Sequence, residues 1–446
     1  MIVGDEGDYV VRAGSVLLRQ VSIGGRIVDI AIGDDGTIAA IGEGIGAEYK
    51  GDAEFIVEGK QDIAIPGLVN THTHAAMALF RGYADDLPLH EWLTSKIWPL
   101  EALLTGDDVY HGTRLACLEM IRSGTVAFND MYFFMKDAAR AVTEMGMKAV
   151  LAYGFIDLFD EERREREIRA TEEFCRWIGS LRNPSIRAAV GPHAVYTVST
   201  EAMKWLADFA KREGIIVHVH LSETEREVAE CEKMYGRRPA FVLDECGLLT
   251  ERTTAAHCCW LDQQECNLLG KRGVHVSYNP VSNMKLAVGR AIPYQWLKEA
   301  GANVTLGTDG AASNNNLDLM EGMKFAALLQ KFFWNSQTIL PAHDTLAMAT
   351  SSGARALGFG DGRLMAGSPA DIVLVDRYAV CNTPLHHLES NLVYSCTGGS
   401  VKTLICSGKV LMQDRVVFDE RKIIEDAAKA AQRLLDRLGE QVIQEH

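Results

Sequence analysis

One unit is repeated along the middle of the chain: a short run rich in β-branched residues, a polar loop, and a longer stretch with helical periodicity. Residues 107–124 illustrate the helical part, because they begin at an Asp typical of a helix N-terminus and end at a glycine. Strands alternating with helices in this way are typical of a (β/α)8 barrel, although a doubly wound sheet fits the same pattern. The eight runs are Ala64–His74, Thr125–Tyr132, Lys148–Asp157, Ile186–Tyr196, Ile215–Glu223, Thr253–Cys259, Gly273–Asn283 and Asn303–Gly310.

The flanks of the repeat have a different pattern. Residues 10–57 and 371–418 contain short alternating runs, turn signals such as DDGT and CSGKV, and few helical windows. Each flank is too short to bury a good core by itself. Residues 421–446 have helical periodicity and predict a closing helix.

Composition excludes several classes of partner. The 446 residues are 47% hydrophobic and 24% charged, which is typical of a globular protein, and their net charge of −15 repels nucleic acid and anionic membranes. No apolar run approaches the roughly 18 residues that span a bilayer, and the N-terminus lacks the pattern of a secretion signal. We therefore expect a cytoplasmic protein with no nucleic-acid or membrane partner, whose ten cysteines are reduced thiols.

Histidines gather at the predicted strand ends. His72 and His74 close the first run, and because side chains alternate along a strand, both point the same way. In a (β/α)8 barrel the C-terminal ends of all strands meet at one face, where catalytic residues collect. We therefore expect the strand-end residues to share one pocket. These residues are His72, His74, His193, His218, His220, Glu223, His257 and Asp309.

Part of this set predicts a metal site. The candidate ligands are His72, His74, His220 and Asp309, with one position left open for water. Imidazole nitrogens with a single carboxylate favour Zn²⁺ or Fe²⁺ over Mg²⁺ or Ca²⁺. An isolated His-X-His pair would be no better evidence for a metal than for an ordinary core, but the other strand-end residues support the metal. His218 fits packing, or a place behind the ligands, as well as it fits ligation.

Such a site suits hydrolysis. A bound transition metal lowers the pKa of its water to about 7, which makes hydroxide available at neutral pH. Glu223 follows His220 closely and could protonate a ring nitrogen or an amine leaving group. The alternative for Glu223 is a solvated acid at a helix N-terminus.

Longer motifs resemble a known family. PGLVNTHTH at residues 66–74, HVHLSE at 218–223, His257, LGTDGAASNNNLDLM at 306–320 and GSPADIVLVD at 367–376 resemble the amidohydrolase superfamily, specifically its 5'-methylthioadenosine/S-adenosylhomocysteine deaminase branch. The resemblance covers nearly the whole chain. It implies a (β/α)8 TIM barrel over residues 63–364, a small β-sandwich built from residues 1–62 and 365–420, and a C-terminal helix over 421–446.

The resemblance also implies a role for each site residue. The four candidate ligands would hold one divalent metal ion and not two, because strand four lacks the lysine that bridges two metals in binuclear members. The ion would most simply be Zn²⁺, with Fe²⁺ as the alternative. Asp309 would also take a proton from the attacking water. Glu223 would carry a proton to the purine N1, and His257 would orient the hydroxide.

Substrate contacts are implied in the same way. Glu91, in the segment after strand one, would hold the ribose hydroxyls, and His193 would contact the substrate beside Glu223. Trp92 and Trp98 have near-helical spacing, which is more typical of a core than of a pocket lining.

The implied reaction is hydrolytic deamination at C6 of adenine. The substrates would be 5'-modified adenosines such as S-adenosylhomocysteine, 5'-methylthioadenosine, 5'-deoxyadenosine or adenosine, and the products the inosine analogue and ammonia. The alternatives are a deaminase or chlorohydrolase of another nitrogen heterocycle (guanine, pterin or s-triazine) and a noncatalytic scaffold with the same barrel. We expect a nucleoside as the small-molecule partner, and a homo-oligomer.

The sequence does not decide which 5' substituent the substrate carries. The carboxylate of S-adenosylhomocysteine would require a cation, and the candidates that follow strand three are Arg163, Arg164, Arg166 and Arg169. Their helical, acid-interleaved setting is more typical of a solvated face. A small 5' group is therefore as consistent with the sequence as a charged one.

Overall fold

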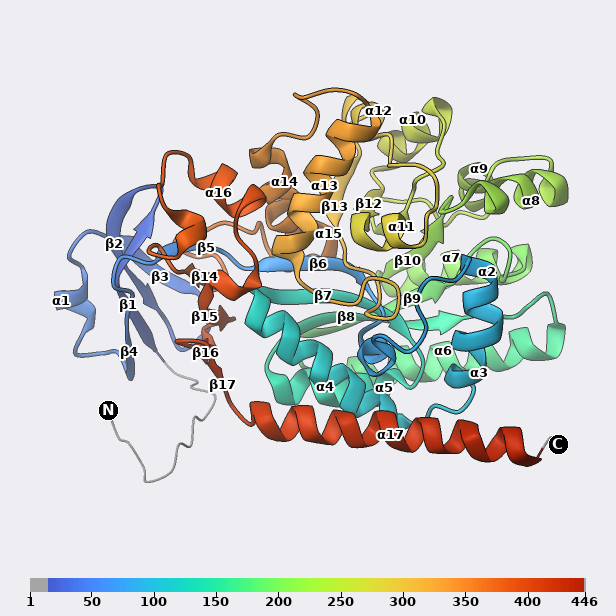
Figure 1. Cartoon of the computed structure of the whole chain (residues 1–446), viewed down its shortest axis with the longest axis horizontal. Helices are drawn as coiled ribbons and strands as arrows, with labels where there is room; N and C mark the ends of the chain where they lie inside the picture. Colours follow the sequence, from blue (N-terminus) through green and yellow to red (C-terminus); the bar gives the residue numbers. More distant parts are fainter. Residues whose placement is uncertain (1–14, 445–446) are drawn as a thin grey trace.

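The barrel is confirmed by a computed structural model, which describes residues 15–444. Each barrel strand pairs in parallel with the next along the chain (Figure 1), so the doubly wound alternative is wrong. The N–H groups of Thr308 and Asp309 donate to the carbonyl of His72, at 3.2 and 2.9 Å. These two hydrogen bonds hold the segment that follows the last barrel strand against the first barrel strand. The strands are β6 (Leu68–Thr73), β7 (Thr125–Tyr132), β8 (Lys148–Phe155), β9 (Ile186–Pro192), β10 (Ile216–Leu221), β11 (Thr253–His257), β12 (His275–Tyr278) and β13 (Asn303–Leu306).

Helices join the strands. The first of them has clear local signals, since Thr105 and Asp108 form a capping box and Gly124 ends the helix with a φ of 98°. The helices of the barrel are α4 (Gly106–Ser123), α5 (Met135–Met145), α6 (Glu161–Leu181), α7 (Thr200–Glu213), α8 (Glu225–Tyr235), α9 (Pro239–Glu245), α10 (Gln263–Arg272), α11 (Pro280–Lys285), α12 (Tyr294–Glu299), α13 (Leu319–Phe333), α14 (Ala342–Ala349) and α15 (Ser351–Leu357).

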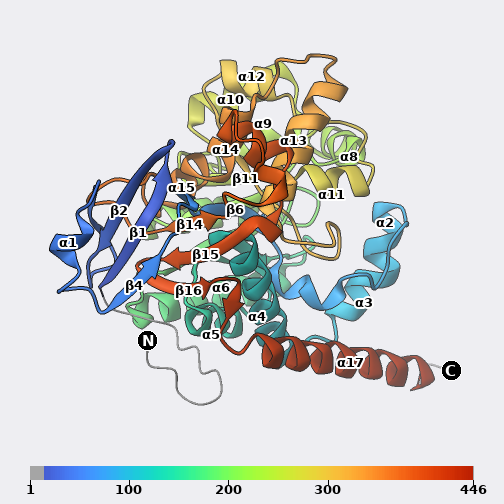
Figure 2. The same ribbon diagram turned by 60° about the vertical axis from the view of Figure 1, so that its left-hand side comes forward.

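Both ends of the chain build a second sheet, at the left of Figures 1 and 2, as the resemblance implied. Its order is β17-β16-β15-β14-β5-β1-β2-β3, with β4 paired to β1. The two ends meet where β14 pairs antiparallel with β5. The predicted strand residues 10–14 lie outside the described part. The strands are β1 (Val16–Ile23), β2 (Arg26–Ile32), β3 (Ile38–Gly42), β4 (Phe55–Glu58), β5 (Ile63–Pro66), β14 (Ile372–Val375), β15 (Val401–Cys406), β16 (Lys409–Gln413) and β17 (Val416–Val417).

The barrel and the second sheet have separate hydrophobic cores. Leu18, Ile30 and Ile372 pack together in the core of the second sheet. The neighbouring β14 residues Val373 and Val375 point the other way and belong to the core of the barrel. One strand therefore joins the two parts through its two faces.

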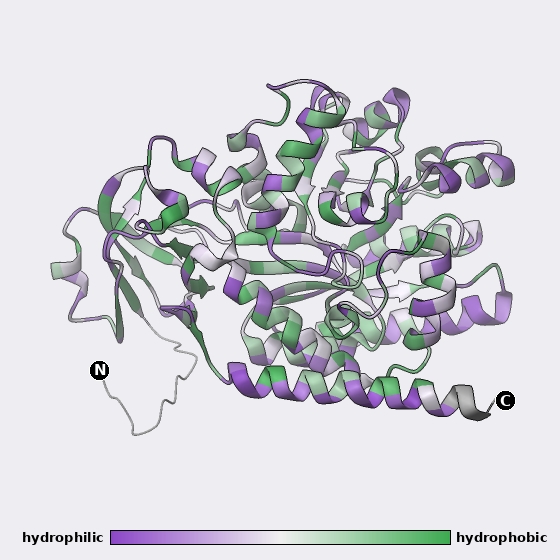
Figure 3. Cartoon of the chain, viewed as in Figure 1, coloured by the Kyte–Doolittle hydropathy of each residue, from purple (hydrophilic) through white to green (hydrophobic). Residues whose placement is uncertain are grey.

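The C-terminal helix α17 (Glu420–Gln444) lies along α4 (Figure 2). Its buried side chains Ile423, Ala427, Ala430 and Leu434 recur every three or four residues, so hydrophobic and hydrophilic residues alternate along it (Figure 3). Among residues 15–444, no helix combines the length and the apolar character needed to cross a membrane.

A chain of short helices follows β6 and lies at the end of the barrel toward which the strands run (Figure 1). These are η1 (Ala75–Phe80), α2 (Leu89–Trp92), the π-helix η2 (Leu93–Ile97) and α3 (Trp98–Glu101). The remaining short helices are α1 (Gly46–Tyr49), η3 (Val380–Asn382), α16 (Leu388–Tyr394) and η4 (Gly398–Ser400).

Candidate active site

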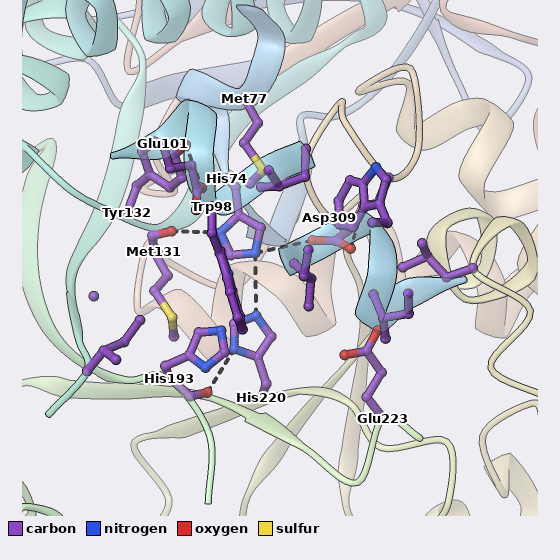
Figure 4. Close-up of a pocket in the computed structure, with 18 of the residues that line it drawn as sticks. His74, Met77, Trp98, Glu101, Met131, Tyr132, His193, His220, Glu223 and Asp309 are labelled. Carbon is purple, nitrogen blue, oxygen red and sulfur yellow. Dashed lines mark hydrogen bonds and ion pairs between the residues drawn. The ribbon is translucent and has the colours of Figure 1, made fainter. Parts of the chain in front are cut away.

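A pocket lies at the C-terminal ends of the barrel strands (Figure 4). This is the face where the strand-end residues were expected to meet. His72 is fully buried beside the pocket, with its ring 4.9 Å from that of His74. The predicted residues that line the pocket are His74, His193, His220, Glu223, His257 and Asp309.

Three histidine rings turn their Nε2 atoms toward one centre. The Nε2 atoms of His74 and His220 are 3.4 Å apart, and a ligand nitrogen of His72 lies within 4.8 Å of one on each of them. On the far side of each ring, Nδ1 of His74 is 2.6 Å from the carbonyl of Met131, and Nδ1 of His220 is 2.8 Å from the carbonyl of His193. A carbonyl only accepts, so Nδ1 of these two rings carries the proton and Nε2 presents its lone pair.

Asp309 completes the centre. Its Oδ1 lies 3.3 Å from Nε2 of His72 and 3.3 Å from Nε2 of His74, while its Oδ2 accepts hydrogen bonds from Ser282 (2.6 Å) and Ser313 (2.7 Å). Burial alone would raise the pKa of Asp309, but its close contact with the His72 ring holds the pKa well below its ordinary value. The carboxylate is therefore ionised and oriented by the two serines.

This centre fits a divalent transition metal. Nε2 of His72 is buried with no hydrogen-bond partner among the described residues. A buried nitrogen without a partner is expected at a metal ligand when no ion is bound. Burial also lowers the pKa of His72 to about 3, so its ring is neutral at pH 7 and free to coordinate. Three imidazoles and one carboxylate are a donor set for Zn²⁺ or Fe²⁺. The predicted ligands are thus brought together.

Glu223 and His257 face each other at the edge of the centre. Oε1 of Glu223 lies 3.7 Å from Nδ1 of His257, and only 13% of the Glu223 side chain is exposed. Burial and the nearby charge of Asp309 raise the pKa of Glu223 to about 8, so this acid is largely protonated at pH 7. Nδ1 of His257 is 2.9 Å from the amide of Asn283, which leaves Nε2 of His257 as its donor atom.

Glu227 supports this arrangement and was missed from the sequence. Its buried carboxylate accepts the backbone N–H groups of Ser222 and Glu223, each at 2.8 Å. Ser222 has a φ of 47°, so the carboxylate stabilises an unusual turn that presents Glu223 to the pocket. The Thr-X-X-Glu spacing from Thr224 to Glu227 is the capping-box pattern that could have pointed to it.

His193 contributes two groups. Its ring lines the pocket and lies 2.9 Å from the hydroxyl of Thr197, while its carbonyl orients His220. Burial lowers the pKa of His193 to about 3 and keeps the ring neutral. The side chain is placed where a substrate contact is possible.

One protein family matches the sequence over the whole length of the barrel. Residues 63–411 match the model of the amidohydrolase family. The chain belongs to the amidohydrolase family. The resemblance inferred from the motifs is confirmed.

Relatives of this amidohydrolase carry deaminase names. It is 62% identical to a 5'-deoxyadenosine deaminase of Methanoregula boonei, over 95% of this chain and 96% of that protein. It is 48% identical to 5-methylthioadenosine/S-adenosylhomocysteine deaminase 1 of Archaeoglobus fulgidus, over 86% of this chain and 90% of that protein. A solved structure of an adenosine deaminase from Xanthomonas campestris with bound zinc superposes with a TM-score of 0.87 at 34% identity, covering 95% of this chain and 99% of that one.

Glu91 does not line the pocket of this amidohydrolase, whereas Glu101 does. Glu91 is exposed on α2, and its role in binding ribose stays a prediction. Glu101, at the end of α3, is part of the pocket wall and accepts a 2.8 Å hydrogen bond from the hydroxyl of Tyr132. Burial raises the pKa of Glu101 to about 7. Sequence reasoning missed Glu101, because both acids lie in short helices whose path over the barrel no local pattern predicts.

The remaining pocket wall is mostly apolar. Trp92 and Trp98, for which a core position was favoured, both line the pocket. Trp92 is buried and Trp98 is 43% exposed. The described lining also contains Met131, Phe133 and Ile156, and it includes no lysine or arginine. The arginines at 163, 164, 166 and 169 lie on α6 and are not part of this lining.

Proposed function

We propose that this amidohydrolase deaminates adenosines with an uncharged 5' group, replacing the 6-amino group by oxygen and releasing ammonia. The observation that carries the proposal is a buried acid with a raised pKa, Glu223, in the same pocket as the clustered histidines and Asp309. An amine is a poor leaving group, and a protonated carboxyl beside the reacting ring is what its departure requires. The names of the relatives point to the same chemistry.

The four candidate ligands would hold one divalent cation, for which we propose Zn²⁺. When bound, the cation lowers the pKa of a coordinated water and so supplies a nucleophile near neutral pH. The neighbour with bound zinc supports the choice of metal. Two seryl hydroxyls on Oδ2 of Asp309 leave its Oδ1 to face the histidines.

The residues of this chain move the protons. Asp309 accepts one proton from the incoming water as the C6–O bond forms, and Glu223 donates its own proton to N1 of the ring. The C6–N bond then breaks, the amine takes the Asp309 proton and leaves as ammonia, and the remaining proton on the oxygen restores Glu223. Nε2 of His257 would donate a hydrogen bond to the attacking oxygen, since its Nδ1 faces the side-chain amide of Asn283.

We propose that Glu101 accepts hydrogen bonds from the ribose hydroxyls. A diol needs an acceptor such as a carboxylate, and Glu101 is the described pocket acid not engaged in the metal centre or the proton transfer. The hydroxyl of Tyr132 fixes one of its oxygens, so the other can receive a donor from the substrate.

The apolar wall supports an uncharged 5' substituent. Burying the carboxylate and ammonium groups of S-adenosylhomocysteine against Met131, Phe133 and Ile156 would leave both charges unpaired, which is costly. A methyl or methylthio group would be stabilised by the same wall. We therefore propose 5'-deoxyadenosine and 5'-methylthioadenosine as the preferred substrates.

Ammonia release from a substrate panel tests this proposal. The panel is adenosine, 5'-deoxyadenosine, 5'-methylthioadenosine, S-adenosylhomocysteine, guanine and a chlorinated s-triazine. We expect the highest kcat/KM for the two compounds with small apolar 5' groups. Activity confined to guanine, or chloride release from the triazine, would contradict the substrate assignment. A cytoplasmic location, a homo-oligomeric state and the domain boundaries drawn from the sequence stay predictions.

A further inference from the structure

His218 lies directly behind one of the candidate ligands. It is fully buried on β10, and its Nε2 is 2.8 Å from Nδ1 of His72. The two ring planes are nearly perpendicular, at 89°. Because side chains alternate along a strand, His218 shares a face with His220 at the end of the same strand. His72 therefore has Asp309 on its Nε2 side and His218 on its Nδ1 side.

The partner of His72 differs in kind from the partners of the other two histidines. Nδ1 of His74 and Nδ1 of His220 each face a main-chain carbonyl, which accepts a hydrogen bond in every state. The Nδ1 of His72 faces another imidazole, which accepts only when its own nitrogen carries no proton. If His72 donates from Nδ1, then Nε2 of His218 is the acceptor, and the proton of His218 is on its Nδ1.

The remaining atoms agree with this assignment. Nδ1 of His218 and Nε2 of His72 are both buried without a hydrogen-bond partner among residues 15–444. The unpartnered nitrogen of His72 is the one that faces the metal centre, so a bound cation would satisfy it. The unpartnered nitrogen of His218 is the cost of this arrangement, since a buried N–H without an acceptor is destabilising. A purely structural residue would not need to carry that cost.

We propose that His218 is a positioning residue for the metal site: it accepts the Nδ1 proton of His72 and so holds the Nε2 of His72 toward the cation. The inference rests on the metal ligands given under the proposed function. Partners on the far nitrogen of a metal-bound histidine set its tautomer and ring orientation, and their loss weakens metal binding by roughly 10- to 100-fold. The metal affinity of this chain should therefore depend on the acceptor at position 218.

Two substitutions separate this role from simple packing. His218→Gln keeps an acceptor near the position of Nε2, whereas His218→Leu fills a similar space with no acceptor. His218→Phe, which also carries no acceptor, serves the same purpose if the Leu variant does not fold. Zn²⁺ affinity is measured on the full chain by competition with a chelator, and thermal unfolding of the metal-free proteins by circular dichroism reports folding separately.

We expect His218→Leu to bind Zn²⁺ roughly 10- to 100-fold more weakly than wild type. We expect His218→Gln to recover most of the lost Zn²⁺ affinity. We also expect the metal-free Gln and Leu variants to unfold at similar temperatures, so that the difference in affinity does not come from folding. Equal Zn²⁺ affinity of wild type and the Leu variant would overturn the inference, as would a Gln variant as weak as Leu. A wild-type chain that binds no Zn²⁺, or a His74→Ala variant that binds it as tightly as wild type, would instead contradict the metal ligands themselves.

Discussion

The hydroxyl of Tyr132 donates a 2.8 Å hydrogen bond to the carboxylate of Glu101, on the wall of the pocket that holds the candidate metal ligands. Tyr132 ends β7 and Glu101 ends α3, so this contact attaches the short helices after β6 to the barrel. It also fixes a carboxylate on the pocket wall, where we propose that it binds ribose.

Replacing Glu101 tests ribose recognition. A hydrogen bond to a charged group contributes about 1.5–3 kcal/mol, so we expect Glu101→Gln to lower kcat/KM for 5'-deoxyadenosine roughly 10- to 100-fold. Glu91→Gln, in the same segment but exposed, is the matched control and should leave kcat/KM unchanged. Steady-state ammonia release from both variants is the measurement. The opposite ranking would assign ribose binding to Glu91, as the resemblance implied.

The pH dependence of the reaction tests Glu223 as the proton donor. Its pKa is raised to about 8 by burial and by the charge of Asp309, so the proton is present below pH 8 and lost above it. We therefore expect kcat/KM to fall as pH rises through about 8. Glu223→Gln should lower kcat by roughly 10²- to 10⁴-fold and remove this limb of the profile. A wild-type profile that rises through pH 8, or a Gln variant with the same limb, would assign the proton to another group.

Glu227 should control the placement of Glu223. Glu227→Ala leaves the N–H groups of Ser222 and Glu223 without their acceptor, and displacement of a catalytic group by about 1 Å can cost up to 100-fold in rate. We expect kcat to fall about 10- to 100-fold while the metal content stays unchanged. Glu225→Ala, on an exposed position of the same helix, should retain full activity. Parallel losses in both variants would indicate a general effect of charge.

The ion pair between Lys148 and Asp371 should stabilise the contact between the barrel and the second sheet. The Lys148 side chain is 5% exposed, and Asp371 also accepts the N–H of Ser407 at 2.9 Å. Removing one partner of a buried pair leaves the other charge buried without a counter-charge. We therefore expect Lys148→Met to lower the free energy of unfolding by about 3–5 kcal/mol. Lys136→Met breaks an exposed pair with Glu173 and should cost at most about 1 kcal/mol. Urea denaturation compares them, and equal losses would contradict the buried role.

The sequence predicted which side chains meet at the candidate metal centre, because their positions depend on two periodicities. Alternation along a strand places His72 and His74 together, and a closed parallel barrel brings Asp309 to the same end of the molecule. Both rules act on segments that the chain itself marks with β-branched runs. The predicted starting point of α4 is also correct to within a residue, because its capping box is local.

Other features depend on packing between segments far apart in the chain. Glu101 reaches the pocket only because the π-helix η2 and the short helices around it lie across the strand ends, and no local pattern encodes that path. The pairing of β5 with β14 joins strands some three hundred residues apart, and it was expected only from the family resemblance. Glu227 can support Glu223 only because the backbone makes a left-handed turn at Ser222, and no local sequence pattern predicts that turn.

Metal removal and restoration test the central claim most directly. The wild-type chain is stripped with a chelator, shown by circular dichroism to remain folded, and reloaded with Zn²⁺ before ammonia release from 5'-deoxyadenosine is followed. We predict one ion bound per chain, loss of activity on stripping, and its return with Zn²⁺ together with equal amounts of ammonia and the inosine analogue. A folded, zinc-loaded protein that releases no ammonia from any 5'-modified adenosine, or full activity in the stripped protein, would contradict the account.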